Sequence, residues 1–185
     1  MRNMMTMVIA VLATALLIGN TTVNAAENLG GTFFNTVENL GSILRKSGWD
    51  RMIGTWVDAQ TKGKMYKSVT AWRFKDQVLE SSSEDFLQGK KDISLMIYNP
   101  KKSEVFHVSA DDKGGSTLGR WTFTKEEAIL DMTFVTPEKQ EGQLQFRYKL
   151  IDDDTMVITV VLPEPIEIKM IRVKEKGKTK GSCPK

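Results

Sequence analysis

Cysteine is almost absent from this 185-residue chain, in which Cys183 is the only one. A chain with one cysteine has no internal disulfide, so its fold must be stabilised by a hydrophobic core alone. Cys183 lies in a Gly-Ser-Cys-Pro segment near the end of the sequence. Two interpretations of it stay open, a dispensable thiol and the site of an intermolecular disulfide or attachment.

Histidine is equally scarce, because His107 is the only one. One histidine without nearby cysteine cannot build a zinc site unless several carboxylates join it. The chain also lacks His-Glu-x-x-His, Gly-x-Ser-x-Gly, Cys-x-x-Cys and phosphate-loop motifs. We therefore expect no catalytic residue, no metal site and no cofactor. His107 alternates with Phe106 and Val108, which predicts a surface position, and a catalytic base or metal ligand is the alternative.

Acidic residues form clusters, but these lie in predicted turns, where solvated carboxylates are common. The cluster at 152–154 lacks the glycine and the distal glutamate of a calcium loop. No pair stands out as the acid and base of a glycosidase. The clusters are Glu84-Asp85, Asp111-Asp112, Glu126-Glu127 and Asp152-Asp153-Asp154.

No large excess of one charge is present, since the formal net charge is +3. Residues 174–185 hold five lysines and one glutamate, so the pI near 8.9 largely reflects this end of the chain. The near-neutral remainder gives no basis for a nucleic-acid groove. We interpret residues 175–185 as a flexible basic tail, with contact to an acidic membrane surface or a partner as the alternative.

Long apolar runs are confined to the beginning of the chain. Arg2 precedes an apolar run from Met4 to Gly19, and small residues end at Ala25. This pattern predicts a signal peptide over 1–25, and therefore an exported protein, periplasmic or secreted. A membrane anchor is the alternative, but the run is shorter than the ~20 residues of a typical span. We expect no integral membrane segment in the mature chain.

Residues 26–48 are predicted to form a flexible lead and one short helix. Val37, Leu40, Ile43 and Leu44 recur at helical spacing, which predicts an amphipathic helix over 36–46. Asn35 and Glu38 resemble a capping box at its start, and Gly48 is the predicted stop.

From residue 49 to residue 174 the hydrophobic period changes from 3.6 to 2, and short polar turns separate about ten strand-like segments. Links of hairpin length leave no room for crossover helices, so successive strands should be antiparallel neighbours. We predict one all-β domain, an up-and-down barrel, since closure removes the two exposed edges of an open meander. An open sandwich is the alternative.

Three features of this segment are similar to the lipocalin-like (calycin) group of β-barrels. They are Gly54-Thr55-Trp56 on the first strand, the short helix before it, and Arg172 on the last strand. The resemblance implies that Arg172 covers Trp56 at a closed end of the barrel, with Gly54 beside them. Tyr98-Asn99-Pro100 and the turn at 111–114 further resemble exported bacterial proteins with a lipocalin-like domain.

The alternation also predicts which side chains face the interior. Ser68 and Thr70 share a face with large aromatic residues, and buried hydroxyls need partners that a ligand or water could supply. A filled core and a ligand cavity both remain open. The predicted ligand-binding residues are Tyr66, Ser68, Thr70, Trp72, Phe74, Trp121, Phe123, Phe134, Phe146 and Tyr148.

Three hypotheses of function follow. The favoured one is a non-catalytic exported barrel that binds a small, largely apolar molecule, which requires an interior cavity of roughly 300 Å³ or more. The second is a structural or interaction protein of the cell envelope, with a filled barrel and a protein partner contacted by its loops or N-terminal helix. The third is an enzyme that uses His107 or a loop carboxylate.

Overall fold

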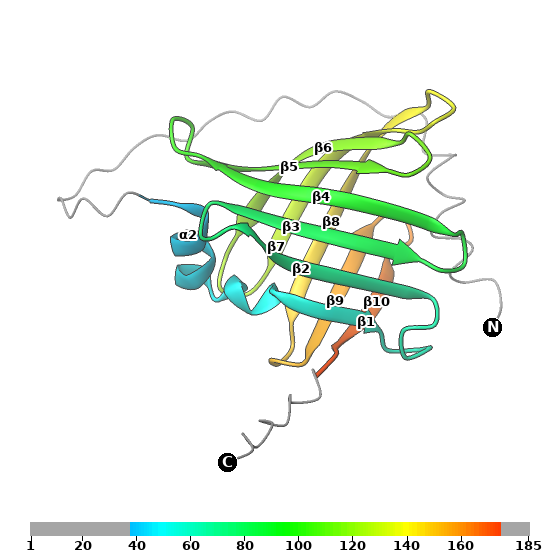
Figure 1. The fold of residues 1–185 in the computed structure, drawn as a ribbon, viewed down its shortest axis with the longest axis horizontal. Coiled ribbons are helices and arrows are strands. Elements are labelled where there is room, and N and C mark those ends of the chain that lie inside the picture. Colours follow the sequence, from blue (N-terminus) through cyan, green and yellow to red (C-terminus); the bar gives the residue numbers. More distant parts are fainter. Residues whose placement is uncertain (1–37, 175–185) are drawn as a thin grey trace, which may run out of the picture.

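The computed structural model describes residues 38–174, which form a closed barrel of ten antiparallel strands preceded by one short helix (Figure 1). This confirms the predicted fold class. The predicted signal peptide (1–25), the lead up to residue 37 and the tail (175–185) with Cys183 lie outside the described residues. The elements are α2 (Leu40–Ser47), the 3-10 helix η2 (Trp49–Met52), β1 (Gly54–Asp58), β2 (Tyr66–Phe74), β3 (Val78–Asp85), β4 (Lys90–Asn99), β5 (Glu104–Asp111), β6 (Ser116–Phe123), β7 (Ala128–Val135), β8 (Glu141–Leu150), β9 (Thr155–Val161) and β10 (Ile166–Arg172).

The order of strands around the barrel follows the order in sequence. Each strand pairs with its neighbours along the chain, and β1 pairs with β10 to close the sheet. In that pairing Trp56 lies opposite Arg172. Closure leaves neither β1 nor β10 with an unpaired edge, so the predicted barrel, and not the open sandwich, is correct. Within residues 38–174, neither helix has the length and hydropathy needed to cross a membrane.

Helix α2 begins later than the sequence predicts. Asn39 precedes the helix, and its side chain accepts a hydrogen bond from the Ser42 amide at 2.9 Å, while the Ser42 hydroxyl accepts one from the Asn39 amide at 3.1 Å. The capping box is therefore Asn39–Ser42, because serine at the third helical position can replace the expected glutamate. Asn35 lies outside the described residues. Gly48 ends the helix in the left-handed conformation (φ 79°), as predicted.

Helix α2 and the 3-10 helix η2 cover one end of the barrel, which we call the covered end (Figure 1). Leu40 and Leu44 of α2 are fully buried in the core that Trp49 and Trp56 share. The Trp49 indole also donates to the Thr124 carbonyl, at 2.8 Å, in the β6–β7 turn. The apolar face of the amphipathic helix α2 thus covers this end of the barrel.

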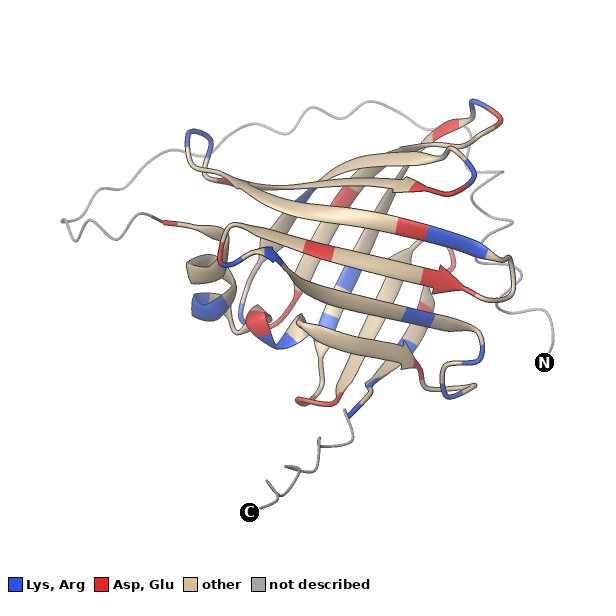
Figure 2. Ribbon diagram, viewed as in Figure 1, with Lys and Arg blue, Asp and Glu red and all other residues tan. Residues whose placement is uncertain are grey.

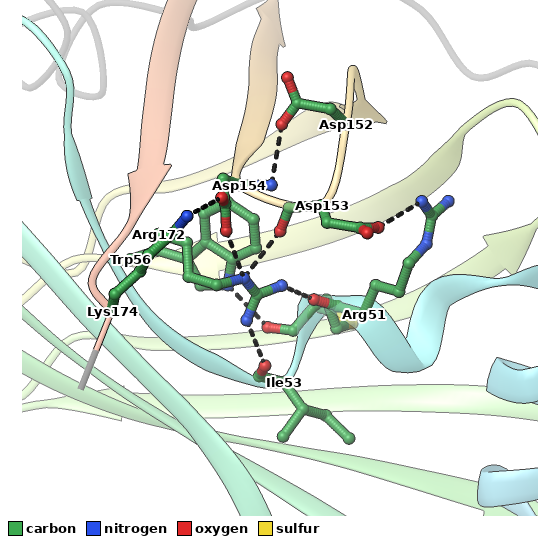
Figure 3. A network of polar contacts seen from close by, with 9 residues as sticks. Arg51, Ile53, Trp56, Asp152, Asp153, Asp154, Arg172 and Lys174 are labelled. Atoms are coloured by element: carbon green, nitrogen blue, oxygen red, sulfur yellow. Dashed lines mark hydrogen bonds and ion pairs between the residues drawn. The ribbon is translucent and has the colours of Figure 1, made fainter. Parts of the chain in front are cut away.

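Arg172 connects the two ends of the barrel sequence (Figure 3). Its guanidinium carbon lies 4.3 Å from the centre of the Trp56 ring, and Nη1 donates to the Ile53 carbonyl at 2.7 Å. Nη2 donates to the Arg51 carbonyl, and Nε donates to the Asp153 carbonyl at 2.7 Å. One side chain therefore satisfies carbonyls of η2, of the residue before β1 and of the β8–β9 turn, while it covers the indole.

Gly54 is required at the start of β1 for two reasons. Its φ of 135° is a conformation that residues with a side chain rarely adopt. A Cβ atom at this position would also lie 2.5 Å from Nη1 of Arg172. The glycine of the Gly-x-Trp motif thus provides the space that the guanidinium occupies.

Replacement of Arg172 tests this closure. We expect Arg172→Met to lower the free energy of unfolding by about 2–4 kcal/mol, since the cation–π contact and several charged hydrogen bonds are lost together. Arg172→Lys keeps the charge but not the planar fork, so it should recover only part of the loss. Denaturant unfolding monitored by circular dichroism measures both.

The matched control is Arg73→Met, since Arg73 is exposed on β2 and its nearest acidic partner, Glu80, is 3.9 Å away. This change should cost no more than about 0.5 kcal/mol. Equal losses in Arg172→Met and Arg73→Met would contradict the role given to Arg172.

Candidate functional site

A cavity of about 230 Å³ lies inside the barrel. Every strand from β1 to β9 contributes to its wall, and Met52 of η2 and Trp56 of β1 meet it from the covered end. The other lining residues are Tyr66, Ser68, Thr70, Leu79, Ser81, Ser83, Asp92, Ser94, Met96, His107, Ser109, Thr117, Trp121, Leu130, Met132, Phe146, Tyr148, Met156 and Ile158.

One wall of the cavity is a row of hydroxyl side chains that crosses five adjacent strands. Each residue of this hydroxyl belt is the direct cross-strand neighbour of the next. Its members are Thr70 (β2), Ser81 (β3), Ser94 (β4), Ser109 (β5) and Thr117 (β6). Because Ser and Thr side chains are short, a row of five leaves unfilled the space that Leu or Phe at the same positions would occupy.

The hydroxyls of the belt are partnered mostly by one another. Thr70 donates to the Ser81 hydroxyl at 3.1 Å, and Ser109 and Thr117 share a bond of 2.6 Å. Ser94 donates to the Ser81 carbonyl at 3.4 Å. These bonds offset the cost of polar groups in a barrel interior, so the belt can be polar without destabilising the fold.

A second polar row lies one step nearer the end opposite α2. Ser68 pairs with Ser83, and Ser83 with Asp92, whose carboxylate accepts the Ser83 hydroxyl. Burial raises the pKa of Asp92, although the bond from Ser83 and the charge of Lys90 oppose this shift. Burial also raises the pKa of Tyr66 to about 12. Both shifts show that this part of the interior disfavours charge.

His107 faces the cavity, so its predicted surface position is wrong. Its cross-strand neighbours are Met96 on β4 and Gly119 on β6, and Phe106 and Val108 point outward instead. Burial lowers the pKa of His107 to about 4, which makes the imidazole neutral at pH 7.

The error about His107 has a physical origin in strands β4 to β6. These strands carry apolar residues on their outer face, where Ile93 is 57% and Leu118 64% exposed. Period-two alternation shows that the two faces of a strand differ but not which one is inside, and in β5 the apolar pair Phe106 and Val108 lies outside.

Trp121 contributes a buried donor with no partner to the wall. The residue is 8% exposed, and among residues 38–174 its indole Nε1 has no hydrogen-bond acceptor. Its ring centre lies 5.0 Å from that of Tyr148 and 6.1 Å from that of His107. Three side chains able to donate hydrogen bonds are thus gathered at one part of the cavity.

The wall across the barrel from the belt is apolar. It is built by β7, β8 and β9, from Leu130, Met132, Phe146, Met156 and Ile158. The cavity therefore has a mainly polar side on β2–β6, where Leu79 and Met96 also line it, and a mainly apolar side on β7–β9, where Tyr148 adds one hydroxyl. Such a division suits a molecule that is itself amphipathic.

Aspartates form the turns at the end opposite α2. Asp58 is 2% exposed and accepts hydrogen bonds from the Thr61 amide at 2.7 Å and from the Tyr66 amide at 3.2 Å, which fixes the first residue of β2. Asp85 ends β3 and accepts from the Leu87 amide at 2.9 Å. Glu84-Asp85 thus belongs to a strand end, not to the predicted turn, and these carboxylates serve turn geometry.

Six of the ten predicted ligand-binding residues line the cavity. They are Tyr66, Ser68, Thr70, Trp121, Phe146 and Tyr148. Contact between these side chains and a ligand stays a prediction.

The other four predicted residues lie elsewhere. Phe74 is 64% exposed, because a register shift between Trp72 and Phe74 turns the end of β2 and breaks the alternation. Trp72 and Phe123 pack against the core without lining the cavity. Phe134 is buried against the inward glycine Gly142, likewise outside the lining.

Sequence reasoning missed most of the polar wall. Ser81, Ser83, Asp92, Ser94, His107, Ser109 and Thr117 all line the cavity. Their signal was present as polar residues at alternate positions of several consecutive strands. It could be recognised only by aligning the strands, because each strand alone resembles an ordinary surface strand.

No group of three or more His, Cys, Asp or Glu side chains is placed to hold a metal ion within residues 38–174. No protein-family model matches the chain, and no curated protein matches it.

His107 predicts a pH dependence of stability. Its pKa is about 4 in the folded chain and near 6.5 in the unfolded chain. Between these values the unfolded state binds more protons, so the free energy of unfolding falls as the pH drops from 6.5 towards 4. The slope from this group is at most about 1.4 kcal/mol per pH unit. In His107→Gln this contribution is removed, and urea unfolding at pH 7 and pH 4.5 measures the difference.

Asp92 acts in the opposite direction, because its raised pKa makes stability fall as the pH rises. It is present in both proteins, so the comparison isolates His107, the only histidine of the chain. If the wild type and His107→Gln lose the same free energy of unfolding between pH 7 and pH 4.5, His107 is not buried as described.

Proposed function

We propose that this chain is an exported, non-catalytic, lipocalin-like barrel that binds a small, largely apolar molecule in its interior. The observation that carries the proposal is the cavity itself, formed where five adjacent strands present short hydroxyl side chains. A protein selected only for stability gains from filling such a space, since voids forfeit packing contacts. A retained cavity with one polar and one apolar wall is typical of a binding site.

The volume narrows the proposal. The cavity, at about 230 Å³, is smaller than the roughly 300 Å³ that a drug-sized guest requires. The requirement stated for the favoured hypothesis is therefore not met, and we restrict the proposal to a ligand the size of a single ring or a short chain. Such a ligand would lie against Phe146, Met132 and Ile158 on the apolar side.

Lipocalin-like identity and export rest on different observations. The closed antiparallel barrel, the covering helix and the Arg172–Trp56 contact support the first. The pattern of residues 1–25 supports the second. The absence of a catalytic motif from the sequence favours binding over catalysis, and the alternative with a filled barrel is disfavoured by the cavity.

Two neighbouring serines on β3 provide a test with a matched control. Ser81 lines the cavity and Ser82 is exposed on the outside. We expect Ser81→Leu to fill the cavity and abolish retention of a small molecule, and Ser82→Leu to leave it unchanged. Native mass spectrometry of the chain purified from its own host, followed by analysis of the organic extract, measures retention.

Circular dichroism establishes that both variants are folded. A bound small molecule in the wild type and Ser82→Leu, but not in Ser81→Leu, supports the proposal. Retention by all three proteins would place the bound molecule outside the cavity and overturn it.

A further inference from the structure

The hydrogen-bonding inventory of the cavity points to the chemistry of its ligand. We infer that the ligand is uncharged and presents a hydrogen-bond acceptor, of the carbonyl class, to the group formed by Trp121, His107 and Tyr148. This inference rests on the proposed function and specifies the ligand of the same site. Two properties of the cavity wall support it, the scarcity of charged groups and the presence of a donor that has no partner within residues 38–174.

The cavity wall disfavours a charged ligand. None of the cavity-lining residues is Lys or Arg, and Asp92 is the only acidic one. Figure 2 shows that charged residues lie mainly at turns and strand ends, and Lys90 at the start of β4 pairs with Asp111 at 2.6 Å. A carboxylate ligand would find no lysine or arginine in the wall and would be repelled by Asp92 whenever Asp92 is ionised.

A cationic ligand is disfavoured by the same environment. Its one candidate counter-ion, Asp92, already accepts the Ser83 hydroxyl and has a raised pKa because it is buried. Burial also lowers the pKa of His107, so the wall disfavours positive charge as well. An uncharged ligand avoids the cost of burying either an anion or a cation in this cavity.

The cavity wall also holds a hydrogen-bond donor without a partner in the described part of the chain. An indole N–H donates and cannot accept, so the buried Trp121 Nε1 can be satisfied only by an acceptor. The neutral His107 ring and the Tyr148 hydroxyl lie beside it, and each carries both a donor and an acceptor, so the indole N–H is the donor in excess. The belt hydroxyls on the same wall are engaged with one another or with a backbone carbonyl. A carbonyl oxygen, which accepts two hydrogen bonds, matches this local excess of donors.

Gly119 of β6 lies beside these donors, where neighbouring atoms of β7 leave no room for a side chain. It faces inward between His107 and Met132, and a Cβ atom there would lie 2.5 Å from the Asp131 carbonyl and 2.8 Å from the Met132 Cβ. No side chain is therefore tolerated next to the imidazole at this position. A ligand whose acceptor meets His107 and Trp121 would place its apolar part against Met132, Phe146 and Ile158, which line the same cavity.

Four probes of nearly equal size separate the possible chemistries. Acetophenone carries a neutral acceptor, ethylbenzene lacks it, benzoate is anionic and benzylammonium is cationic. Titration calorimetry at pH 7, with the full chain freed of bound molecules, measures each affinity. We expect acetophenone to bind about tenfold more tightly than ethylbenzene, and both ions to bind more weakly than acetophenone.

Trp121→Phe removes the indole N–H and keeps an aromatic ring. It should reduce the preference for acetophenone over ethylbenzene to about threefold or less, with ethylbenzene affinity nearly retained. Trp72→Phe is the matched control, because Trp72 packs against the core without lining the cavity. Thermal unfolding establishes that both variants are folded.

The outcomes distinguish this inference from the proposed function. If ethylbenzene equals acetophenone, or if Trp121→Phe leaves the preference intact, the acceptor assignment is overturned while the binding cavity stands. If an ion binds most tightly, the uncharged ligand is overturned. If no probe binds to the wild type or to Trp72→Phe, the proposed function and the inference fall together.

Discussion

The contact between Arg172 and Trp56 is the constraint on which the barrel depends. The guanidinium lies over the indole and bonds to the carbonyls of Arg51, Ile53 and Asp153, which belong to two segments far apart in the sequence. Its position pairs the last strand with the first, and Gly54 supplies the space it needs. Because β1 and β10 pair, the sheet has no open edge and encloses its interior. Burial there shifts the pKa of the titratable side chains.

Within that compartment, side-chain size decides where space remains. Large residues such as Trp49, Trp56 and Leu79 fill the covered end. The side chains of the hydroxyl belt are too short to reach the apolar wall, so a cavity remains between the two walls. The belt is stable there because hydroxyls on adjacent strands partner each other, which only a continuous row across paired strands permits.

Prediction from the sequence succeeded best for features that depend on local pattern. The period of two, the hairpin-length turns and the Gly-x-Trp motif identified the barrel and its closure. The helix stop at Gly48 was correct because a left-handed glycine ends a helix wherever it occurs. The helix start was misplaced because Asn35 and Asn39 are both plausible caps, and only packing of Leu40 and Leu44 under the barrel selects the second.

Periodicity and residues with strong backbone preferences were enough to predict the alternation and the turns, and they favoured a closed barrel over an open sandwich. The tertiary structure alone decided which face of each strand is inside. A strand apolar on its outer face, such as β5, has the same alternation in either orientation, and the register with its neighbours settles that His107 and Ser109 point inward. Only the tertiary structure shows the cavity, because the five residues of the hydroxyl belt become neighbours only when their strands pair.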